Sequence, residues 1–360
     1  MNKPKDVTIY DLLRHTSGIP DFIFSMGKDW DPSRIASNED VIKYYAAKRE
    51  KLDFEPQAMH RYSNTNYVLL ASIIERVSGK KYGDYLADKI FKPLKMDNTF
   101  VYNRRKKPAK VDNYATGYVW APGSFKKVTM ESPEYNDQTV YYLDGVEGAA
   151  KVNSSAEDVY KWVLALRNNT LLTQAEFDEM TEVSQTNQGK QIPYGFGLDL
   201  RKGENKLTFG HTGSWDGYTT LIYHDKVKDR TIIILENFKM GVTATNNIFQ
   251  ILDSRPLTVE YEKKMPLREA EMIKYTGSYT DESGNEHIIT CKDGRLIYNT
   301  HEVKWDMRFY PYARNEFAAI RQGGANGILK FTQLDNGDTK LEMLQYGNPV
   351  GSGIRKKQPR

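Results

Sequence analysis

Cysteine is nearly absent from this chain of 360 residues, because Cys291 is the only one. A disulfide within the chain is therefore impossible, and metal sites built from several cysteines are excluded. Long apolar runs are also absent, so no segment is long enough to span a bilayer. The N-terminal stretch lacks the apolar core of a signal peptide, and we expect no export signal in the chain as given.

Neither sign of charge dominates, with 51 Lys and Arg against 47 Asp and Glu and a formal net charge of +4. Because this small excess is spread along the chain, we expect no nucleic-acid partner. The six histidines show no spacing typical of metal ligands, and there is no glycine-rich phosphate loop or dinucleotide fingerprint. We therefore expect no metal site and no cofactor.

Several helices can be predicted from their ends. A Ser or Thr followed three positions later by an acidic residue predicts a capped helix start. Such pairs are Thr8 with Asp11, Ser155 with Asp158, and Thr173 with Glu176. Between residues 67 and 77, apolar side chains recur at helical spacing, and Gly79 then provides a C-cap.

The second half of the sequence is rich in β-strands. From Gly195 onward, β-branched runs separated by short turns predict an antiparallel meander. Residues 254–268 are polar with two prolines and predict a linker. Beyond them, short alternating strands with frequent turns predict a small barrel or sandwich. We therefore expect domains at 1–253 and 269–360, joined by this linker.

Two short motifs fit nucleophilic serine chemistry, and the first is Tyr62-Ser63-Asn64 at the start of the helix that ends at Gly79. In a catalytic interpretation, Tyr62 acts as general base and acid, and Asn64 hydrogen-bonds the substrate amide. The structural alternative is that Tyr62 is a packed aromatic beside a helix start and Asn64 is an N-cap.

The second motif is GHTGS at residues 210–214, at the end of a predicted strand. In the catalytic interpretation, His211 adds a polar or cationic group and Thr212 binds substrate. Gly213 then allows the substrate to approach the strand closely. The backbone N–H of Ser214 would form half of an oxyanion hole. The alternative is that His211 is an ordinary turn histidine, since spacing in the sequence does not establish proximity.

Taken together, the motifs resemble the serine β-lactamase-like family, which includes class C β-lactamases, D-alanyl-D-alanine carboxypeptidases and related esterases. The stretches that carry the resemblance follow in family order at residues 7–22, 62–82, 90–100, 152–162, 194–200 and 209–220. The resemblance implies an α+β fold, with an antiparallel sheet flanked by helices and the site in the cleft between them. The C-terminal strands resemble the small, lipocalin-like β-barrel often appended to such hydrolases.

The resemblance also implies an acyl-enzyme mechanism and an amide, ester or β-lactam substrate, such as a D-alanyl peptide. It implies an extracytoplasmic location. One departure stands out, because the family's Ser-x-x-Lys nucleophile normally lies well before the stretch that begins here at Leu12. Three tetrapeptides match the pattern, starting at Ser25, Ser78 and Ser124, and none has the expected setting on the first turn of a buried helix.

Without the Ser-x-x-Lys lysine, an unperturbed tyrosine with a pKa of about 10 is about one part in a thousand phenolate at neutral pH. We therefore expect the chain alone to form no acyl-enzyme. Two hypotheses remain open: a serine hydrolase represented here without its nucleophile segment, or a non-catalytic module that binds peptidoglycan-like peptides.

Overall fold

The computed structural model describes residues 7–120, 127–135, 139–203, 206–238, 242–256, 265–300, 307–320, 326–345 and 348–357. Contacts divide the chain into two compact units, which are described separately. The first comprises Met1–Thr116 and Asp137–Asn237, and the second comprises Gly117–Asn136 and Phe238–Arg360. The domain boundaries expected from the sequence stay a proposal, and residues 257–264 of the expected linker lie outside the described part.

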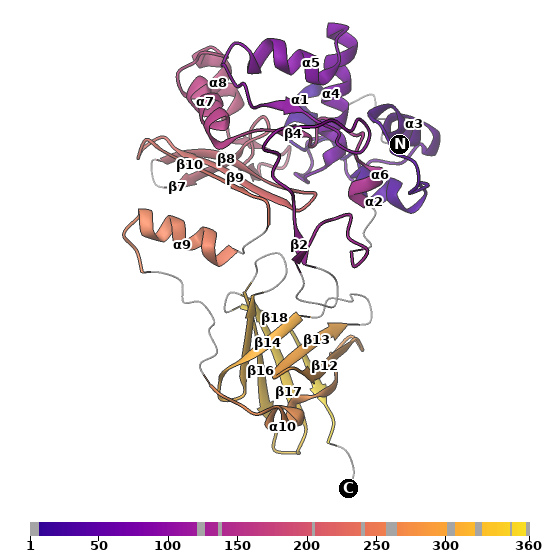
Figure 1. Ribbon diagram of the computed structural model, residues 1–360, viewed down its shortest axis with the longest axis vertical. Helices are drawn as coiled ribbons and strands as arrows, with labels where there is room; N and C mark the ends of the chain where they lie inside the picture. The colour runs from indigo at the N-terminus through magenta and orange to yellow at the C-terminus, as the bar shows by residue number, and fades with distance from the viewer. Residues whose placement is uncertain are drawn as a thin grey trace. The chain divides into compact units, whose positions relative to one another are not determined.

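The first unit combines helices with a sheet (Figure 1). Its helical segments are α1 (Ile9–Leu13), α2 (Phe22–Ser25), η2 (Met26–Lys28), α3 (Asn38–Lys48), α4 (Asn64–Ser78), α5 (Tyr82–Leu86), η3 (Ala87–Phe91), α6 (Thr139–Tyr142), α7 (Ala156–Arg167) and α8 (Gln174–Met180). Its strands are β1 (Phe100–Val101), β4 (Val152–Asn153), β5 (Ser184–Gln185), β6 (Gln191–Ile192), β7 (Asp199–Gly203), β8 (Lys206–Trp215), β9 (Tyr218–Asp225) and β10 (Arg230–Glu236).

The predicted helix ends are confirmed. Thr8 and Thr173 each form a capping box at the start of α1 and α8, and the Ser155 side chain accepts from the backbone of Asp158 at the start of α7. Helix α4 ends at Gly79, whose φ of 68° places it in the left-handed conformation that glycine adopts without strain. The capping residues therefore determine where these helices begin and where α4 ends.

The predicted meander is also confirmed as an antiparallel sheet with the order β10-β9-β8-β7. Helices α7 and α8 pack against one face of it, where Leu166 and Phe177 meet Leu200 and Phe209 (Figure 1). A second core joins α2, α3, α4 and α6, and Trp215 at the end of β8 packs against it. The sheet is thereby connected to the helices that carry the first motif.

The second unit contains a closed antiparallel barrel of the strands β11 to β18, as the sequence predicted. The barrel strands are β11 (Gly277–Thr280), β12 (Glu286–Lys292), β13 (Arg295–Thr300), β14 (Met307–Ala313), β15 (Glu316–Ile320), β16 (Asn326–Gln333), β17 (Thr339–Gln345) and β18 (Asn348–Arg355). The remaining elements are β2 (Val119–Trp120), β3 (Lys127–Val128), α9 (Val242–Leu252), α10 (Glu269–Met272) and η4 (Ile273–Tyr275). Buried aromatic side chains, among them Tyr279, Phe317 and Phe331, form the barrel core.

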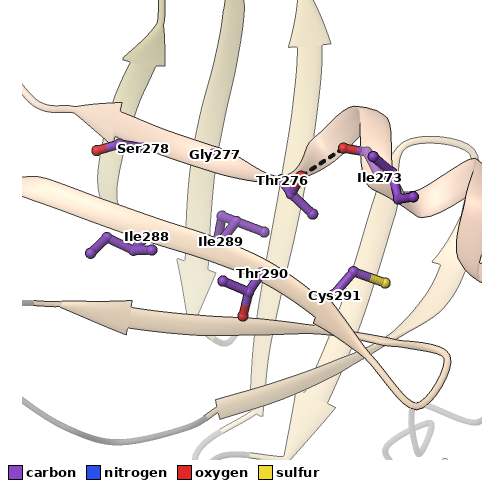
Figure 2. A pocket seen from close by; sticks show the side chains of 8 residues that line it. All are labelled: Ile273, Thr276, Gly277, Ser278, Ile288, Ile289, Thr290 and Cys291. Carbon is purple, nitrogen blue, oxygen red and sulfur yellow. Dashed lines mark hydrogen bonds between the residues drawn. The ribbon is translucent and has the colours of Figure 1, made fainter.

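A hollow of about 460 Å³ lies against this barrel, beside η4, β11 and β12 (Figure 2). Ile273 and residues 276–278 and 288–291 line it, and most of the lining surface is apolar. The Thr276 hydroxyl donates to the carbonyl of Ile273, so it is already satisfied (Figure 2). Burial raises the pKa of the Cys291 thiol, which disfavours a reactive thiolate. We therefore find no catalytic group in this hollow.

Candidate active site

The second motif lies on β8 just beyond the end of its pairing with β7. The ladder between β7 and β8 ends at Asp199 and Gly210, whereas pairing with β9 continues to Trp215. Within the described residues, 211–215 therefore pair with a strand on one side only. The open side is an edge to which an extended peptide could add as a further strand.

The first motif lies where α4 begins. Asn64 is the first residue of the helix, and both its backbone N–H and its side-chain Nδ2 donate to Oδ2 of Asp21, at 2.9 and 2.7 Å. Asp21 also accepts from the backbone of Ile23 and thereby caps α2. Asn64 is therefore not the N-cap, because Ser63 holds that position and Asp21 supplies the capping oxygen.

The structure brings the two motifs together. The ring centroids of Tyr62 and His211 are 6.0 Å apart, and Tyr62 is 45% exposed rather than buried in a core. The ring of His15 lies 4.1 Å from that of Tyr62. Tyr194 lies 5.0 Å from His15 by the same measure. Segments that are far apart in the sequence thus form one cluster of tyrosines and histidines.

The other members of the second motif lie on the same strand. Thr212 and Ser214 are exposed, and Gly213 is half-buried opposite Thr220. A Cβ at Gly213 would lie 2.5 Å from Oγ1 of Thr220. A side chain at position 213 would therefore require the Thr220 hydroxyl to move.

Tyr194 is a residue of this cluster that the motif analysis did not single out. Its hydroxyl lies 3.0 Å from Nε2 of His211, and the Nδ1 of His211 lies 2.5 Å from the carbonyl oxygen of Thr212. Tyr194 is buried, and burial raises the pKa of its phenol far above the ordinary value. The only signal in the sequence was its position at the start of the stretch 194–200, which resembles the family.

His15 forms hydrogen bonds with residues of the first motif and of helix α4. Its Nδ1 faces two donors, the backbone N–H of Ser63 at 3.2 Å and the side-chain amide of Asn66 at 3.1 Å. Burial, with smaller contributions from His60 and His211, lowers the pKa of His15 to about 3. The ring is therefore neutral with its proton on Nε2, and it fixes the backbone that follows Tyr62.

The charges near Tyr62 do not favour its ionisation. Partial burial raises the pKa of the phenol, and the carboxylates of Asp21 and Asp199 raise it further. A general base at this position therefore needs a cation that the described surroundings of Tyr62 do not provide. The raised pKa of Tyr62 agrees with the role that the resemblance gives to the Ser-x-x-Lys lysine, which is to favour the ionised tyrosine.

The three Ser-x-x-Lys matches differ in what the structure allows. Ser25 is the last residue of the four-residue helix α2 and is followed by the 3-10 turn η2, so it is not on the first turn of a buried helix. Ser78 ends α4, and its hydroxyl donates to the carbonyl of Ile74 at 2.6 Å. Lys81 is exposed, and its ammonium group lies 3.7 Å from the carboxylate of Glu75. Ser124 lies outside the described residues.

The turn after the second motif is held by an ion cluster. Asp216 and Gly217 join β8 to β9 with φ values of 53° and 84°, which is typical of a two-residue type I′ turn. The Asp216 carboxylate accepts from the guanidinium groups of Arg104 and Arg105 at 2.8 to 3.1 Å. Hydrogen bonds from these arginines outweigh burial and lower the pKa of Asp216.

Two absences complete the description of the site. Across the residues that the structure describes, no three His, Cys, Asp or Glu side chains gather in a way that could hold a metal ion. In the same residues, no helix combines the length and the apolar character needed to cross a membrane.

Comparisons with known proteins agree with this arrangement. A family model described as Beta-lactamase matches residues 2–252. The chain is 35% identical over 299 residues to Penicillin-binding protein 4* of Bacillus subtilis, which covers 81% of this chain. It spans 66% of that relative's own length, and 57% of the length of a second curated relative.

Solved structures show the same fold. The octameric penicillin-binding protein homologue of Pyrococcus abyssi has a TM-score of 0.56 at 22% identity, over 97% of this chain and 78% of that one. The D-amino acid amidase of Ochrobactrum anthropi has a TM-score of 0.51 at 26% identity, over 65% of this chain and 64% of that one. The chain therefore belongs to the Beta-lactamase family of serine hydrolase-like proteins.

Proposed function

We propose that the chain carries the substrate-binding and proton-relay half of a serine hydrolase site that acts on amide or ester bonds. The observation that carries the proposal is the meeting of Tyr62 with His211 beside the open edge of β8. In the mechanism, a serine hydroxyl attacks the substrate carbonyl, the amide or ester bond breaks and the amine or alcohol leaves, and water then hydrolyses the acyl-serine ester to release the acid. Tyr62 moves the proton, and residues 212–214 hold the substrate along the strand.

The proposed substrates are D-alanyl peptides, β-lactams or related esters. The relatives named as a penicillin-binding protein and a D-amino acid amidase support this range. An extracytoplasmic location follows as part of the same proposal. The oxyanion hole would use the backbone N–H of Ser214 together with the N–H of the nucleophile itself.

We propose further that this chain on its own forms no acyl-enzyme. Of the two Ser-x-x-Lys serines that the structure describes, Ser25 lies where the short helix α2 passes into η2, and Ser78 lies at the C-terminal end of α4. There, the helix dipole opposes a developing anion. Loss of the nucleophile from a serine hydrolase lowers turnover on the order of a millionfold.

The test combines covalent labelling with binding. A fluorophosphonate and a penicillin are incubated with the chain, and the intact mass is measured. We expect no adduct, and a stoichiometric adduct on Ser25, Ser78 or Ser124 would overturn this part. Binding of an N-acylated D-alanyl-D-alanine amide is measured by calorimetry in parallel. His211→Gln should weaken binding, whereas Tyr160→Phe on the exposed side of α7 should not.

The second candidate is a non-catalytic module that binds peptidoglycan-like peptides. It is favoured by the raised pKa of Tyr62, since a protonated phenol can bind a substrate but is a poor base. The two candidates differ in one outcome. Addition of the upstream Ser-x-x-Lys segment encoded by the gene, if the DNA contains it, should restore labelling for the hydrolase. A binding module gains no labelling.

A further inference from the structure

Strand β10 forms one edge of the four-stranded sheet. It pairs with β9 along all seven of its residues, from Arg230 to Glu236. Among the residues that the structure describes, no strand pairs with its outer side. Half of the backbone N–H and C=O groups of an edge strand point away from the sheet, so a further strand can bind there.

The sequence of β10 lacks the features that usually prevent such pairing. It reads RTIIILE, with no proline, no glycine and no charge between its two ends. The other edge strand, β7, has three charged residues among its five, Asp199, Arg201 and Lys202. Charged side chains discourage pairing between sheet edges, and apolar β-branched side chains favour it. The edge that favours pairing is therefore β10, where the Leu235 side chain is also 41% exposed.

The order of residues in β10 is complementary to itself. Antiparallel pairing of two copies about Ile233 would place Arg230 opposite Glu236 of the second copy, and the two-fold axis would repeat this pair at the other end. All pairs between these ends would be formed by isoleucine, leucine or threonine. A shift of the register by two residues would place Arg230 or Glu236 opposite an isoleucine. The charges at the ends therefore specify one register.

We propose that the outer edge of β10 binds β10 of a second copy of this chain, antiparallel and centred on Ile233, so that the two four-stranded sheets join into one across a two-fold axis. The main-chain hydrogen bonds would provide the affinity and the end charges the register. Strand β9 lies between β10 and β8, so the dimer leaves the open edge of β8 accessible. The proposal is therefore independent of the proposed function.

The first arm of the test measures the oligomeric state of the full chain by sedimentation velocity over a range of concentrations. We expect an equilibrium between monomer and dimer. Arg230→Glu places two carboxylates opposite each other at both ends and should weaken the dimer about tenfold. Arg230→Glu combined with Glu236→Arg makes the charges opposite again and should restore the dimer. The exposed Lys190→Glu, between β5 and β6, makes the same change in net charge and should leave the dissociation constant unchanged.

The second arm tests the register by cross-linking. In a Cys291→Ser background, an introduced cysteine is the only thiol of the chain. The two copies of Ile233→Cys would have Cα atoms about 5 Å apart, within the reach of a disulfide. The two copies of Leu235→Cys would be about 13 Å apart, which is too far. After mild oxidation, we expect covalent dimers for Ile233→Cys and none for Leu235→Cys on non-reducing gels.

A chain that is monomeric at every concentration would overturn the proposal, as would a dimer that Arg230→Glu leaves unchanged. Arg230 and Glu236 lie about 20 Å apart on one strand, so rescue by the exchange of their charges reports contact between two copies. Equal cross-linking of both cysteine variants would indicate unspecific association and would overturn the register. Loss of the dimer when residues encoded upstream are added would show that the edge takes a strand of the same polypeptide, which would overturn the second copy as its occupant.

Discussion

The substitution Asp216→Asn tests whether the turn after the second motif is stabilised by its charge or only by its backbone. Asn adopts positive φ as readily as Asp, so the type I′ turn with Gly217 is retained. What the substitution removes is the negative charge that accepts from Arg104 and Arg105. Any loss of stability therefore reports the ion cluster.

The structure indicates a large effect because the cluster is buried. The side chain of Asp216 is 5% exposed and that of Arg105 is 8% exposed. Removing one partner of a buried ion pair typically costs about 3 to 5 kcal/mol. Arg105 also lies 3.6 Å from Asp144, which offsets part of the loss. We therefore expect a decrease of about 3 kcal/mol in the free energy of unfolding.

Asp229→Asn is a matched control for this experiment. Asp229 also has a positive φ, of 47°, and its carboxylate accepts from Arg167 at 2.7 Å. The two side chains are 40% and 55% exposed, so the pair is a surface pair worth about 0.2 to 1 kcal/mol. Urea unfolding followed by tryptophan fluorescence measures both variants. Equal losses would refute the argument that burial determines the value of these pairs.

The pH dependence of the difference provides a second check. The pKa of Asp216 is lowered in the folded chain, so its contribution is fully present above the unfolded value of about 3.9. It is lost as the pH falls through the folded value. The loss caused by Asp216→Asn should therefore be largest at pH 7 and should shrink at pH 3. A difference that grows toward pH 3 would contradict the assigned sign.

Three further substitutions, one of them with a control variant, test other parts of the fold. Arg14→Met removes guanidinium hydrogen bonds to two carbonyls at the end of α8 and should cost about 2 to 4 kcal/mol, measured by urea unfolding. Gly148→Ala places a Cβ 2.2 Å from the carbonyl oxygen of Tyr67 at a φ of 99°, and should cost about 3 kcal/mol or more. Phe317→Ala in the barrel core should cost about 3 to 5 kcal/mol, whereas the exposed Val350→Ala should change stability by less than about 0.5 kcal/mol. A wild-type unfolding midpoint for any of the three core variants would contradict the packing described here.

The parts of the fold that depend on local chemistry could be predicted from the sequence. The capping pairs at Thr8 and Thr173 each involve atoms three residues apart, and the β8–β9 turn needs only Asp216 and Gly217. The barrel could be predicted because short strands with alternating apolar and polar residues recur along the sequence and are separated by turns. Helix α2 could not be predicted in this way, because it is only four residues long and its cap from Asp21 is a weak signal in isolation.

The site could be predicted only in part, because its contacts are long-range. Tyr62 and His211 were found through short motifs, but the partners that set their chemistry lie elsewhere in the chain. The side-chain amide of Asn64 donates a hydrogen bond to Asp21, and Nε2 of His211 lies within hydrogen-bond distance of the Tyr194 hydroxyl. A histidine in a motif indicates a polar group. Which of its nitrogens is available depends on neighbours that the local sequence does not reveal.

The long-range contacts also explain why His211 and Asn64 differ from Tyr62. His211 and Asn64 both make hydrogen-bonding contacts within the chain, which orient their side chains before a substrate binds. Burial raises the pKa of Tyr62, and among the described residues the carboxylates of Asp21 and Asp199 raise it further. A protonated phenol at this place can donate a hydrogen bond to a carbonyl oxygen but is a poor base. In the function proposed above, a Ser-x-x-Lys helix would supply a nucleophile and a positive charge together, and that charge would lower the pKa of Tyr62.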